Sequence, residues 1–276
     1  MPRYAFRIVN VFTVDGDRFS GNPLCVFEDA RGLTTEQMQS LARQMNLSET
    51  TFVLPSEQAT AHVRIFTPGY EMPFAGHPTL GTASVVAGDV ITFEMKAGLV
   101  AVARDANGYT LKVAYAPKTR PVEAPPADLA RMLSLPEDAV GEPLWVDTGV
   151  EQLVIPIRSS ELVRRAKADP VLIEKYGFSA ARQEAMAYLW ASDTPEHTVR
   201  FFFTSNGAVI EDAATGSACA NLGGYLLAKG KSPITVSLRQ GDAVQRPSRL
   251  GLRVDETGIY VSGQTMELGS GTIELW

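Results

Sequence analysis

The sequence predicts an α+β protein made of two similar halves, and three observations support this fold class. The stretch 64–83 has the pattern of a strand, a tight connection and a helix rich in small residues. The stretch 200–220 repeats this plan, and each copy has Arg, an apolar residue and Phe before a Glu and the helix. A proline-rich segment at 117–126 lies between the two copies and is a candidate linker. With 276 residues, the chain is long enough for two domains of ordinary size.

The clearest local signal in the first half is a helix that begins after Thr34. Thr34 is a good N-cap, and Gln37 three residues later completes a capping box. Apolar residues follow at helical spacing as far as Met45, and the β-branched run 49–54 then predicts a strand that stops at Pro55. The other strands expected in this half are 4–12, 23–27, 91–103 and 109–115, with a turn at 105–108.

The second half shows roughly the same order of elements. Its expected helices are 128–133, 160–176 with an interruption at Pro170, and 216–228. Its expected strands are 143–157 with a turn at Gly149, 185–190 and 198–204. A short terminal strand at 272–276 is expected to return to the sheet of the first half, because it has no counterpart there. We therefore predict one domain at 1–117, joined by 266–276, and a second at 118–265.

Composition narrows the class of protein. The formal net charge is −6 and no Lys/Arg cluster is present, which argues against nucleic-acid binding. No apolar run approaches the roughly 18 residues that a membrane helix needs, and the start lacks the pattern of a signal peptide. The two cysteines, Cys25 and Cys219, have no paired spacing, so we expect a cytoplasmic protein. Three dispersed histidines give no metal-ligand spacing, so we predict no metal site.

The two helices of small residues start with features typical of an anion site. Helices with this composition form because surrounding strands pack closely against them, so we expect each to lie inside a curved sheet. At a helix N-terminus, free backbone N–H groups and the positive end of the dipole favour a carboxylate or a phosphate. Gly76 and Gly216 would let a ligand approach the backbone. The alternative is a tight strand-to-helix turn without a ligand, and the presence of two copies favours a site.

Few residues in these stretches can carry proton chemistry. Glu49 lies at a helix-to-strand junction, where a partly desolvated carboxylate could exchange protons, although local sequence alone favours an exposed strand-end glutamate. Asp212 precedes the second helix and is equally suited to an N-cap or to a functional role. His77 lies in the first turn of its helix, a position that favours a neutral, hydrogen-bonding imidazole. Ser217 lacks the G-x-S-x-G elbow of a nucleophile, so we interpret its hydroxyl as a hydrogen-bond donor to a ligand.

Five motifs together resemble the PhzF family of phenazine-biosynthesis isomerases and their relatives, in the order found in that family. They are Gly21-Asn22-Pro23, Ser48-Glu49-Thr50-Thr51-Phe52, Arg64-Ile65-Phe66-Thr67-Pro68, the run from Pro73 to Gly81, and the run from Asp212 to Ser217. The resemblance implies the diaminopimelate epimerase-like fold, with two pseudo-equivalent domains, each a curved sheet around a central helix, and a site in the cleft between them. It also implies a homodimer, a small-molecule carboxylate substrate and no cofactor.

The resemblance further implies a role for each candidate residue. Proton transfer is assigned to Glu49, which would take a proton from carbon as a base and return it as an acid. Asp212 and His77 match the positions that hold polar groups of the substrate and assist the return of the proton. Groups at Gly76, Gly216, Ser217 and Thr215 would bind the substrate carboxylate. In the phenazine pathway the substrate is trans-2,3-dihydro-3-hydroxyanthranilate, which loses its C3 proton and is reprotonated on the ring.

Two other functions remain as alternatives. Epimerases and racemases of this fold use two cysteines at the starts of the central helices, and the matching positions here are Ala75 and Thr215. Cys219 lies one turn further along, so it cannot replace Thr215, and racemisation by two thiols is disfavoured. The third possibility is a protein that binds a carboxylate without catalysing a reaction.

Overall fold

The structure is a computed structural model that describes residues 1–106, 108–193, 195–205 and 207–275. Contacts between residues divide the chain into two compact units: Met1–Lys112 with Ser262–Trp276 (unit 1), and Val113–Val261 (unit 2). These bounds differ by a few residues from the expected 1–117 with 266–276 and 118–265, and Trp276 itself lies outside the described residues.

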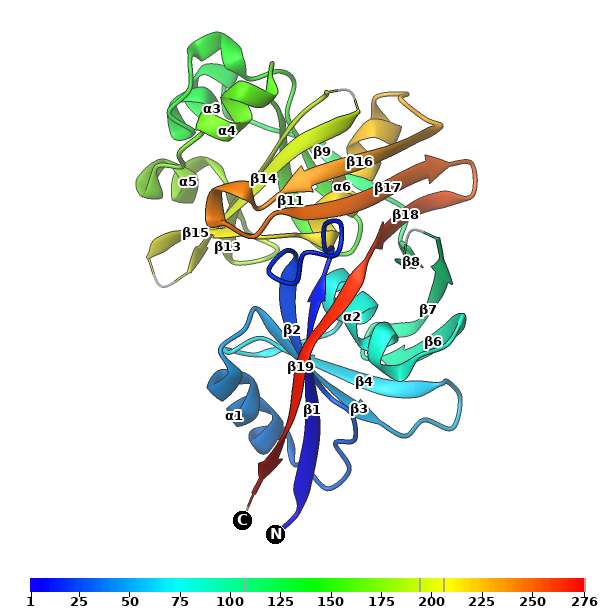
Figure 1. Cartoon of the computed structure of the whole chain (residues 1–276). Coiled ribbons are helices and arrows are strands. Elements are labelled where there is room, and N and C mark those ends of the chain that lie inside the picture. The colour runs from blue at the N-terminus through cyan, green and yellow to red at the C-terminus, as the bar shows by residue number, and fades with distance from the viewer. Residues whose placement is uncertain (107, 194, 206, 276) are drawn as a thin grey trace. The chain divides into compact units, whose positions relative to one another are not determined.

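Unit 1 is a mixed sheet that curves around one helix, α2 (Figure 1). Its strands pair in the order β19–β1–β2–β3–β4–β6–β7–β8, and the β2–β3 and β4–β6 pairs are parallel. Its elements are β1 (Arg3–Val11), β2 (Asn22–Phe27), α1 (Thr35–Met45), β3 (Glu49–Leu54), β4 (Ala61–Phe66), β5 (Glu71–Met72), α2 (Gly76–Val86), β6 (Val90–Met95), β7 (Gly98–Asp105), β8 (Gly108–Lys112) and β19 (Thr265–Glu274). The central position of α2 agrees with the prediction of a helix packed by strands.

Unit 2 has a similar sheet packed against α6. Its strands pair in the order β9–β10–β11–β13–β14–β16–β17, and the β11–β13 and β14–β16 pairs are parallel. Its elements are β9 (Lys118–Pro121), α3 (Pro126–Met132), η1 (Glu137–Ala139), β10 (Leu144–Asp147), β11 (Glu151–Pro156), α4 (Ser160–Arg165), α5 (Pro170–Tyr176), β12 (Phe178–Ser179), β13 (Glu184–Ala191), β14 (Glu196–Ser205), β15 (Ala208–Asp212), α6 (Gly216–Ala228), β16 (Ile234–Gln240), η2 (Asp242–Val244) and β17 (Ser248–Asp255), while β18 (Gly258–Gly263) leads from unit 2 into unit 1.

The two units share one order of strand pairing, which explains the repeat seen in the sequence. β1, β2, β3, β4 and β6 in unit 1 correspond to β10, β11, β13, β14 and β16 in unit 2, and the short strands β5 and β15 form matching hairpins on β4 and β14. In each unit, one further strand from outside this repeat pairs with the first strand of the sheet. β19 pairs with β1, and β9 pairs with β10.

Several sequence-based boundaries need correction. The expected linker at 117–126 contains β9, so it is part of the sheet of unit 2, and β9 is the counterpart that the terminal strand was expected to lack. The terminal strand itself is longer than 272–276. The expected strand 91–103 is two strands, β6 and β7, and the turn at 105–108 joins β7 to β8, although its residue Asn107 lies outside the described residues.

The predicted helices are present, for the physical reasons that predicted them. Thr34 accepts from the Gln37 backbone N–H while the Gln37 side chain accepts from the Thr34 N–H, so the capping box of α1 is complete. The interrupted helix at 160–176 is α4 followed by α5, which starts at Pro170. In α2, a Cβ added to Gly81 would lie 2.5 Å from Leu24 Cδ2, so glycine at this position leaves room for the Leu24 side chain of β2.

Aromatic packing fixes the strands that carry the first candidate residues. Phe27 stacks on Phe52 with ring centroids 4.9 Å apart, and Phe66 meets Phe52 edge-on at 5.4 Å. These three buried rings lie on β2, β3 and β4, and aromatic pairs of this kind add about 0.5–1.5 kcal/mol each beyond their buried area. These contacts hold β3 against β2 and β4 at Phe52, three residues beyond Glu49. Within the described residues, no helix has the length and apolar character needed to cross a membrane.

Candidate active site

Glu49 is the first residue of β3 and is mostly buried. The helix before it ends at Asn46, whose left-handed backbone turns the chain into the strand, and Glu49 then pairs with Leu24 in the parallel β2–β3 ladder. Only 18% of the Glu49 side chain is accessible to solvent. The alternative of an exposed strand-end glutamate is therefore wrong.

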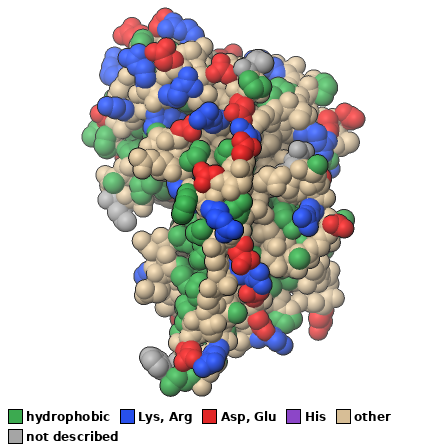
Figure 2. Space-filling model, in the orientation of Figure 1, with side chains coloured by type: hydrophobic (Ala, Val, Ile, Leu, Met, Phe, Trp, Pro, Cys, Tyr) green, Lys and Arg blue, Asp and Glu red, His purple; other side chains and the backbone are tan. Residues whose placement is uncertain are grey.

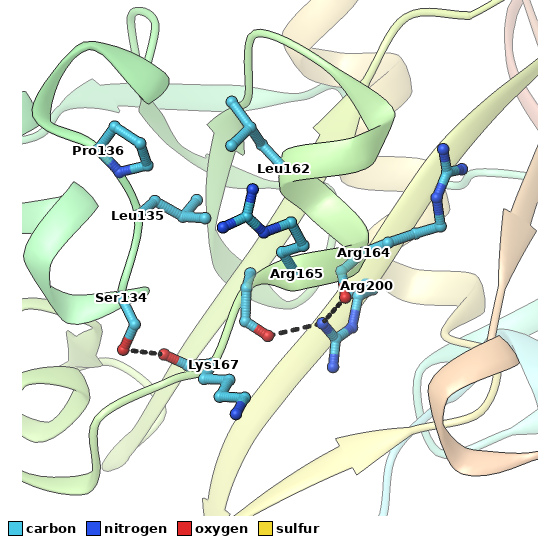
Figure 3. Close-up of a pocket in the computed structure, with 9 residues that line it drawn as sticks. Ser134, Leu135, Pro136, Leu162, Arg164, Arg165, Lys167 and Arg200 are labelled. Atoms are coloured by element: carbon cyan, nitrogen blue, oxygen red, sulfur yellow. Dashed lines mark hydrogen bonds between the residues drawn. The ribbon is translucent and has the colours of Figure 1, made fainter.

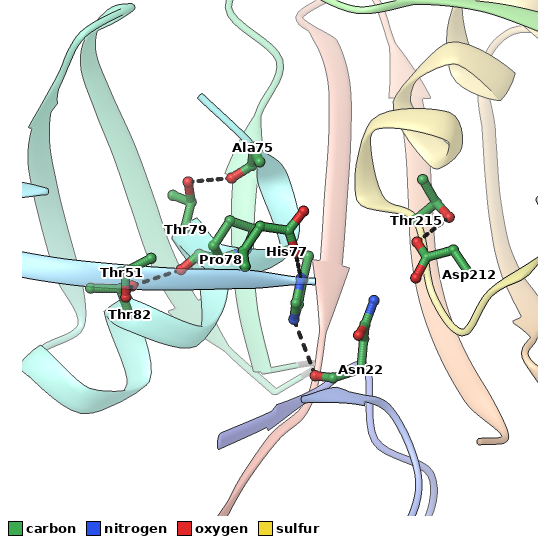
Figure 4. Close-up of polar contacts among 10 residues, drawn as sticks. Asn22, Thr51, Ala75, His77, Pro78, Thr79, Thr82, Asp212 and Thr215 are labelled. Atoms are coloured by element: carbon green, nitrogen blue, oxygen red, sulfur yellow. Dashed lines mark hydrogen bonds and ion pairs between the residues drawn. The ribbon is translucent and has the colours of Figure 1, made fainter. Parts of the chain in front are cut away.

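His77 connects Glu49 to the backbone of β2. Its Nδ1 lies 2.8 Å from Glu49 Oε2, and its Nε2 lies 3.1 Å from the carbonyl oxygen of Asn22 (Figure 4). The ring is buried, with 5% of its surface accessible. The turn that presents the Asn22 carbonyl to His77 requires glycine at position 21. The φ of Gly21 is +76°, and an added Cβ would lie 2.5 Å from the Val11 carbonyl oxygen, so other residues do not fit there.

The two ring nitrogens of His77 have different partners. A backbone carbonyl can only accept, so a hydrogen bond from Nε2 to Asn22 places a hydrogen on Nε2. The other nitrogen, Nδ1, faces Glu49 Oε2, and the donor in that contact depends on the tautomer of the ring. The contact holds the Glu49 carboxyl group in one orientation at the start of β3.

Glu49 still has one carboxyl oxygen for other chemistry. Its Oε2 is occupied by His77, and Oε1 has no hydrogen-bond partner among the residues that the structure describes. His77 holds one oxygen of the carboxyl group in place and the other oxygen is available. Glu49 Oε1 is therefore suited to exchange a proton with carbon. The sequence predicted both residues but not their contact.

The start of α2 presents free donors next to this pair. Ala75 is the N-cap and makes no side-chain capping bond. Among the described residues, the N–H groups of Gly76 and His77 have no acceptor, whereas the Thr79 N–H is satisfied by the Ala75 carbonyl. Two unpaired N–H groups at the positive end of a helix are donors of the kind that bind an oxyanion.

The start of α6 in unit 2 is built differently. Thr215 is the N-cap, and its hydroxyl donates to Asp212 Oδ2 at 2.6 Å (Figure 4). Asp212 is therefore not the N-cap, although its side chain does bond the residue that is. Gln240, which is buried, donates to the Asp212 carbonyl oxygen and to the Thr215 hydroxyl, and so fixes this turn. The N–H groups of Gly216 and Ser217 have no acceptor within the described part of the chain.

A buried polar network orients the Ser217 hydroxyl, and the sequence did not predict it. Ser217 Oγ accepts from Gln152 Nε2 at 3.0 Å, while Gln152 Oε1 accepts from Asn221 Nδ2 at 2.8 Å. Asn221 is fully buried, and its Oδ1 accepts from the N–H and the hydroxyl of Thr148. Because Gln152 donates to Ser217, the Ser217 hydroxyl can direct its own hydrogen to a ligand. The available signal was an asparagine inside an otherwise apolar helix.

The cysteines are not placed for chemistry at either helix start. Ala75 and Thr215 occupy the two N-cap positions. Cys219 lies inside α6 with no accessible surface, and burial raises the pKa of its thiol well above its ordinary value. Burial also raises the pKa of the Cys25 thiol to about 12. Both thiols are therefore poor proton carriers. No group of three His, Cys, Asp or Glu side chains that could hold a metal ion occurs among the described residues.

Comparisons with known proteins match this fold and these motifs. Residues 9–271 match the model of the PhzC-PhzF family, described as phenazine biosynthesis-like protein. An uncharacterized isomerase of Pasteurella multocida is 40% identical over 98% of this chain and 94% of the relative. The trans-2,3-dihydro-3-hydroxyanthranilate isomerase of Pseudomonas aeruginosa is 33% identical over 95% of this chain and 94% of the relative.

Solved structures agree on the fold. A PhzF family protein of Bacillus anthracis superposes with a TM-score of 0.86 at 24% identity, with all of both chains covered. A probable proline racemase of Agrobacterium radiobacter gives a TM-score of 0.63 at 13% identity, covering 99% of this chain and 93% of that one. At these identities the likeness shows the fold alone. The chain thus belongs to the PhzC-PhzF family, and it is an isomerase with the diaminopimelate epimerase-like fold.

Proposed function

We propose that this protein is a cofactor-independent isomerase in which Glu49 moves a proton between two carbons of a small carboxylate-bearing substrate. The observation that carries the proposal is the hydrogen-bonded series from Glu49 through His77 to the Asn22 carbonyl, which holds a mostly buried carboxyl group by one oxygen and leaves the other available. One carboxyl group can act first as a base and then as an acid.

The reaction begins with Glu49 as the carboxylate. Glu49 Oε1 takes a proton from carbon, and the electron pair of the broken C–H bond enters the conjugated system of the substrate. Glu49 then returns the proton to another carbon, and the double bonds have moved. Throughout, His77 Nδ1 holds Glu49 Oε2, so that Oε1 stays directed at the substrate.

The substrate carboxylate is assigned to the free donors of the helix starts. The N–H groups of Gly76 and of Gly216 and the N–H and hydroxyl of Ser217 are donors of the kind that bind an oxyanion. Thr215 and Asp212 form a hydroxyl–carboxylate pair that would hold a polar substituent and assist the return of the proton. The homodimer implied by the family resemblance stays a prediction.

The candidate substrate is trans-2,3-dihydro-3-hydroxyanthranilate. Relatives with this activity in their names are 33% identical to the chain over more than nine-tenths of its length. The compound carries a carboxylate, a hydroxyl and an acidic C3–H bond, which correspond to the oxyanion donors, the Thr215–Asp212 pair and Glu49, respectively.

Following the absorbance change of trans-2,3-dihydro-3-hydroxyanthranilate tests the substrate assignment. We expect enzyme-dependent turnover that is unaffected by thiol reagents, since both cysteines are buried. Thermal stabilisation by the compound without turnover would favour a carboxylate-binding protein instead. Inactivation by thiol reagents would favour the chemistry of a two-cysteine epimerase or racemase.

A further inference from the structure

Unit 2 contains a second feature that the proposed reaction does not use, a pocket of about 540 Å³ beside α3 and α4 (Figure 3). This volume lies within the range of about 300–1,000 Å³ that is typical of small-molecule sites. The residues that line it are Ser134, Leu135, Pro136, Leu162, Arg164, Arg165, Ala166, Lys167 and Arg200. None of them is a candidate for proton transfer or for binding the substrate carboxylate.

Hydrogen bonds hold the walls of the pocket in place. The Lys167 N–H donates to the Leu133 carbonyl oxygen at 2.9 Å, and the Ser134 hydroxyl donates to the Lys167 carbonyl oxygen at 3.1 Å, so the two opposite segments are tied together. Arg200 Nη1 donates to the carbonyl oxygens of Val163, Arg164 and Ala166, which closes the C-terminal end of α4 (Figure 3). The backbone around the pocket is therefore ordered before a ligand binds, and binding would not require the entropic cost of ordering it.

The lining carries four cationic side chains and no carboxylate, in a chain whose net charge is −6. Arg200 is neutralised by Glu211, and Arg165 has only a long contact of 3.6 Å with Glu161, both side chains being exposed. Arg164 and Lys167 have no ion-pair partner among the described residues. Figure 2 shows Lys and Arg side chains, with Asp and Glu side chains among them, over the corner of unit 2 that contains α3, α4 and α5. The expectation from the sequence that no Lys/Arg cluster is present does not hold for residues 164–167. A pocket lining that carries positive charges and no carboxylate favours a bound anion.

We propose that this pocket binds a small organic anion with at least two negative charges, such as a phosphate ester. The guanidinium groups of Arg164 and Arg165 and the ammonium group of Lys167 supply donors for phosphate oxygens, which guanidinium groups bind in a bidentate manner. Leu135 and Pro136 supply an apolar wall for the organic part of the ligand. The mixture of an apolar wall and a few charged groups is typical of small-molecule sites.

Calorimetric titration of the full chain with pyrophosphate and with phenyl phosphate tests this site. The pocket variant is Arg164→Ala with Lys167→Ala, and the control is Arg131→Ala with Lys175→Ala. Like the pocket variant, the control loses two positive charges, but from α3 and α5 at positions outside the pocket lining. All four side chains are at the surface, and circular dichroism checks that both variants fold.

We expect one binding site per chain in the wild type and in the control, and at least about a tenfold higher Kd in the pocket variant, because two charge-assisted contacts are lost. Inorganic phosphate, titrated in the same way, should bind more weakly than phenyl phosphate, because it has no organic part to contact Leu135 and Pro136. No saturable binding to the wild type would overturn the proposal. An equal loss of affinity in the pocket variant and the control would overturn it as well, since the attraction would then be general to the surface.

Discussion

Replacing Glu49 with glutamine is expected to lower kcat by about 10³- to 10⁴-fold, the upper part of the range for general acid–base catalysis, because one carboxyl group performs both proton transfers. Glutamine has the same shape, and its amide N–H can donate to His77 Nδ1 when Nε2 carries the ring hydrogen. The variant should therefore fold and bind substrate as before. Turnover of trans-2,3-dihydro-3-hydroxyanthranilate and the thermal midpoint, measured on the same preparation, check the two parts of this prediction.

Glu94→Gln is the matched control for this substitution. Glu94 also lies on a strand of unit 1 and accepts a hydrogen bond, from Ser56, but it has no part in the proposed site. We expect its kcat to stay within about twofold of the wild type. If Glu49→Gln keeps wild-type turnover, Glu49 is not the proton carrier.

Removing the guanidinium group of Arg200 is expected to lower the free energy of unfolding substantially. Arg200 forms a two-bond ion pair with Glu211, with 12% and 9% of the two side chains accessible, and also donates to three carbonyl oxygens at the end of α4. Arg200→Ala leaves the Glu211 carboxylate buried without its partner, which costs about 3–5 kcal/mol. Urea unfolding followed by circular dichroism measures the change.

The equivalent pair in unit 1 provides an internal comparison. Arg64 pairs with Glu71 across the β4–β5 hairpin and lies over Phe66, as Arg200 lies over Phe202. It is more exposed, and its Nη1 donates to Thr35 Oγ1 and Met38 Sδ of α1 instead of to three carbonyl oxygens, so Arg64→Ala should cost less, about 1.5–3 kcal/mol. The double exchange of Arg200 and Glu211 to methionine should recover part of the loss, because no charge is left unpaired. A larger loss in Arg64→Ala than in Arg200→Ala would contradict this account.

Elements with strong local signals were predictable from the sequence. The capping box at Thr34 located α1, and the bounds 216–228 of α6 follow from its small residues and the glycine beyond its end. β9 was missed because its four residues lie in a proline-rich segment and form a strand only through pairing with β10. Sequence patterns describe local preferences, whereas this strand depends on a partner supplied by the tertiary fold.

The site residues were predictable as individuals but not as a network. Glu49 was assigned through the family resemblance, since local sequence favoured an exposed side chain. Its contact with His77 joins residues 28 apart, and the contact of His77 with the Asn22 carbonyl joins residues 55 apart. Gln152 and Asn221, which orient Ser217, carry no motif at all. These hydrogen bonds join residues far apart in the chain. Local sequence patterns do not show which distant segments the fold brings together.

The central claim is that Glu49 carries the proton from one carbon to another, and the fate of a deuterium label tests it most directly. The measurement is a single turnover, in ordinary water, of trans-2,3-dihydro-3-hydroxyanthranilate deuterated at C3, with the label located in the product by NMR. The account predicts a primary isotope effect and the appearance of part of the deuterium at the carbon that is reprotonated, because one mostly buried carboxyl group removes and returns it. A product that keeps all of its deuterium at C3, or that loses the label equally fast with Glu49→Gln, would contradict the account.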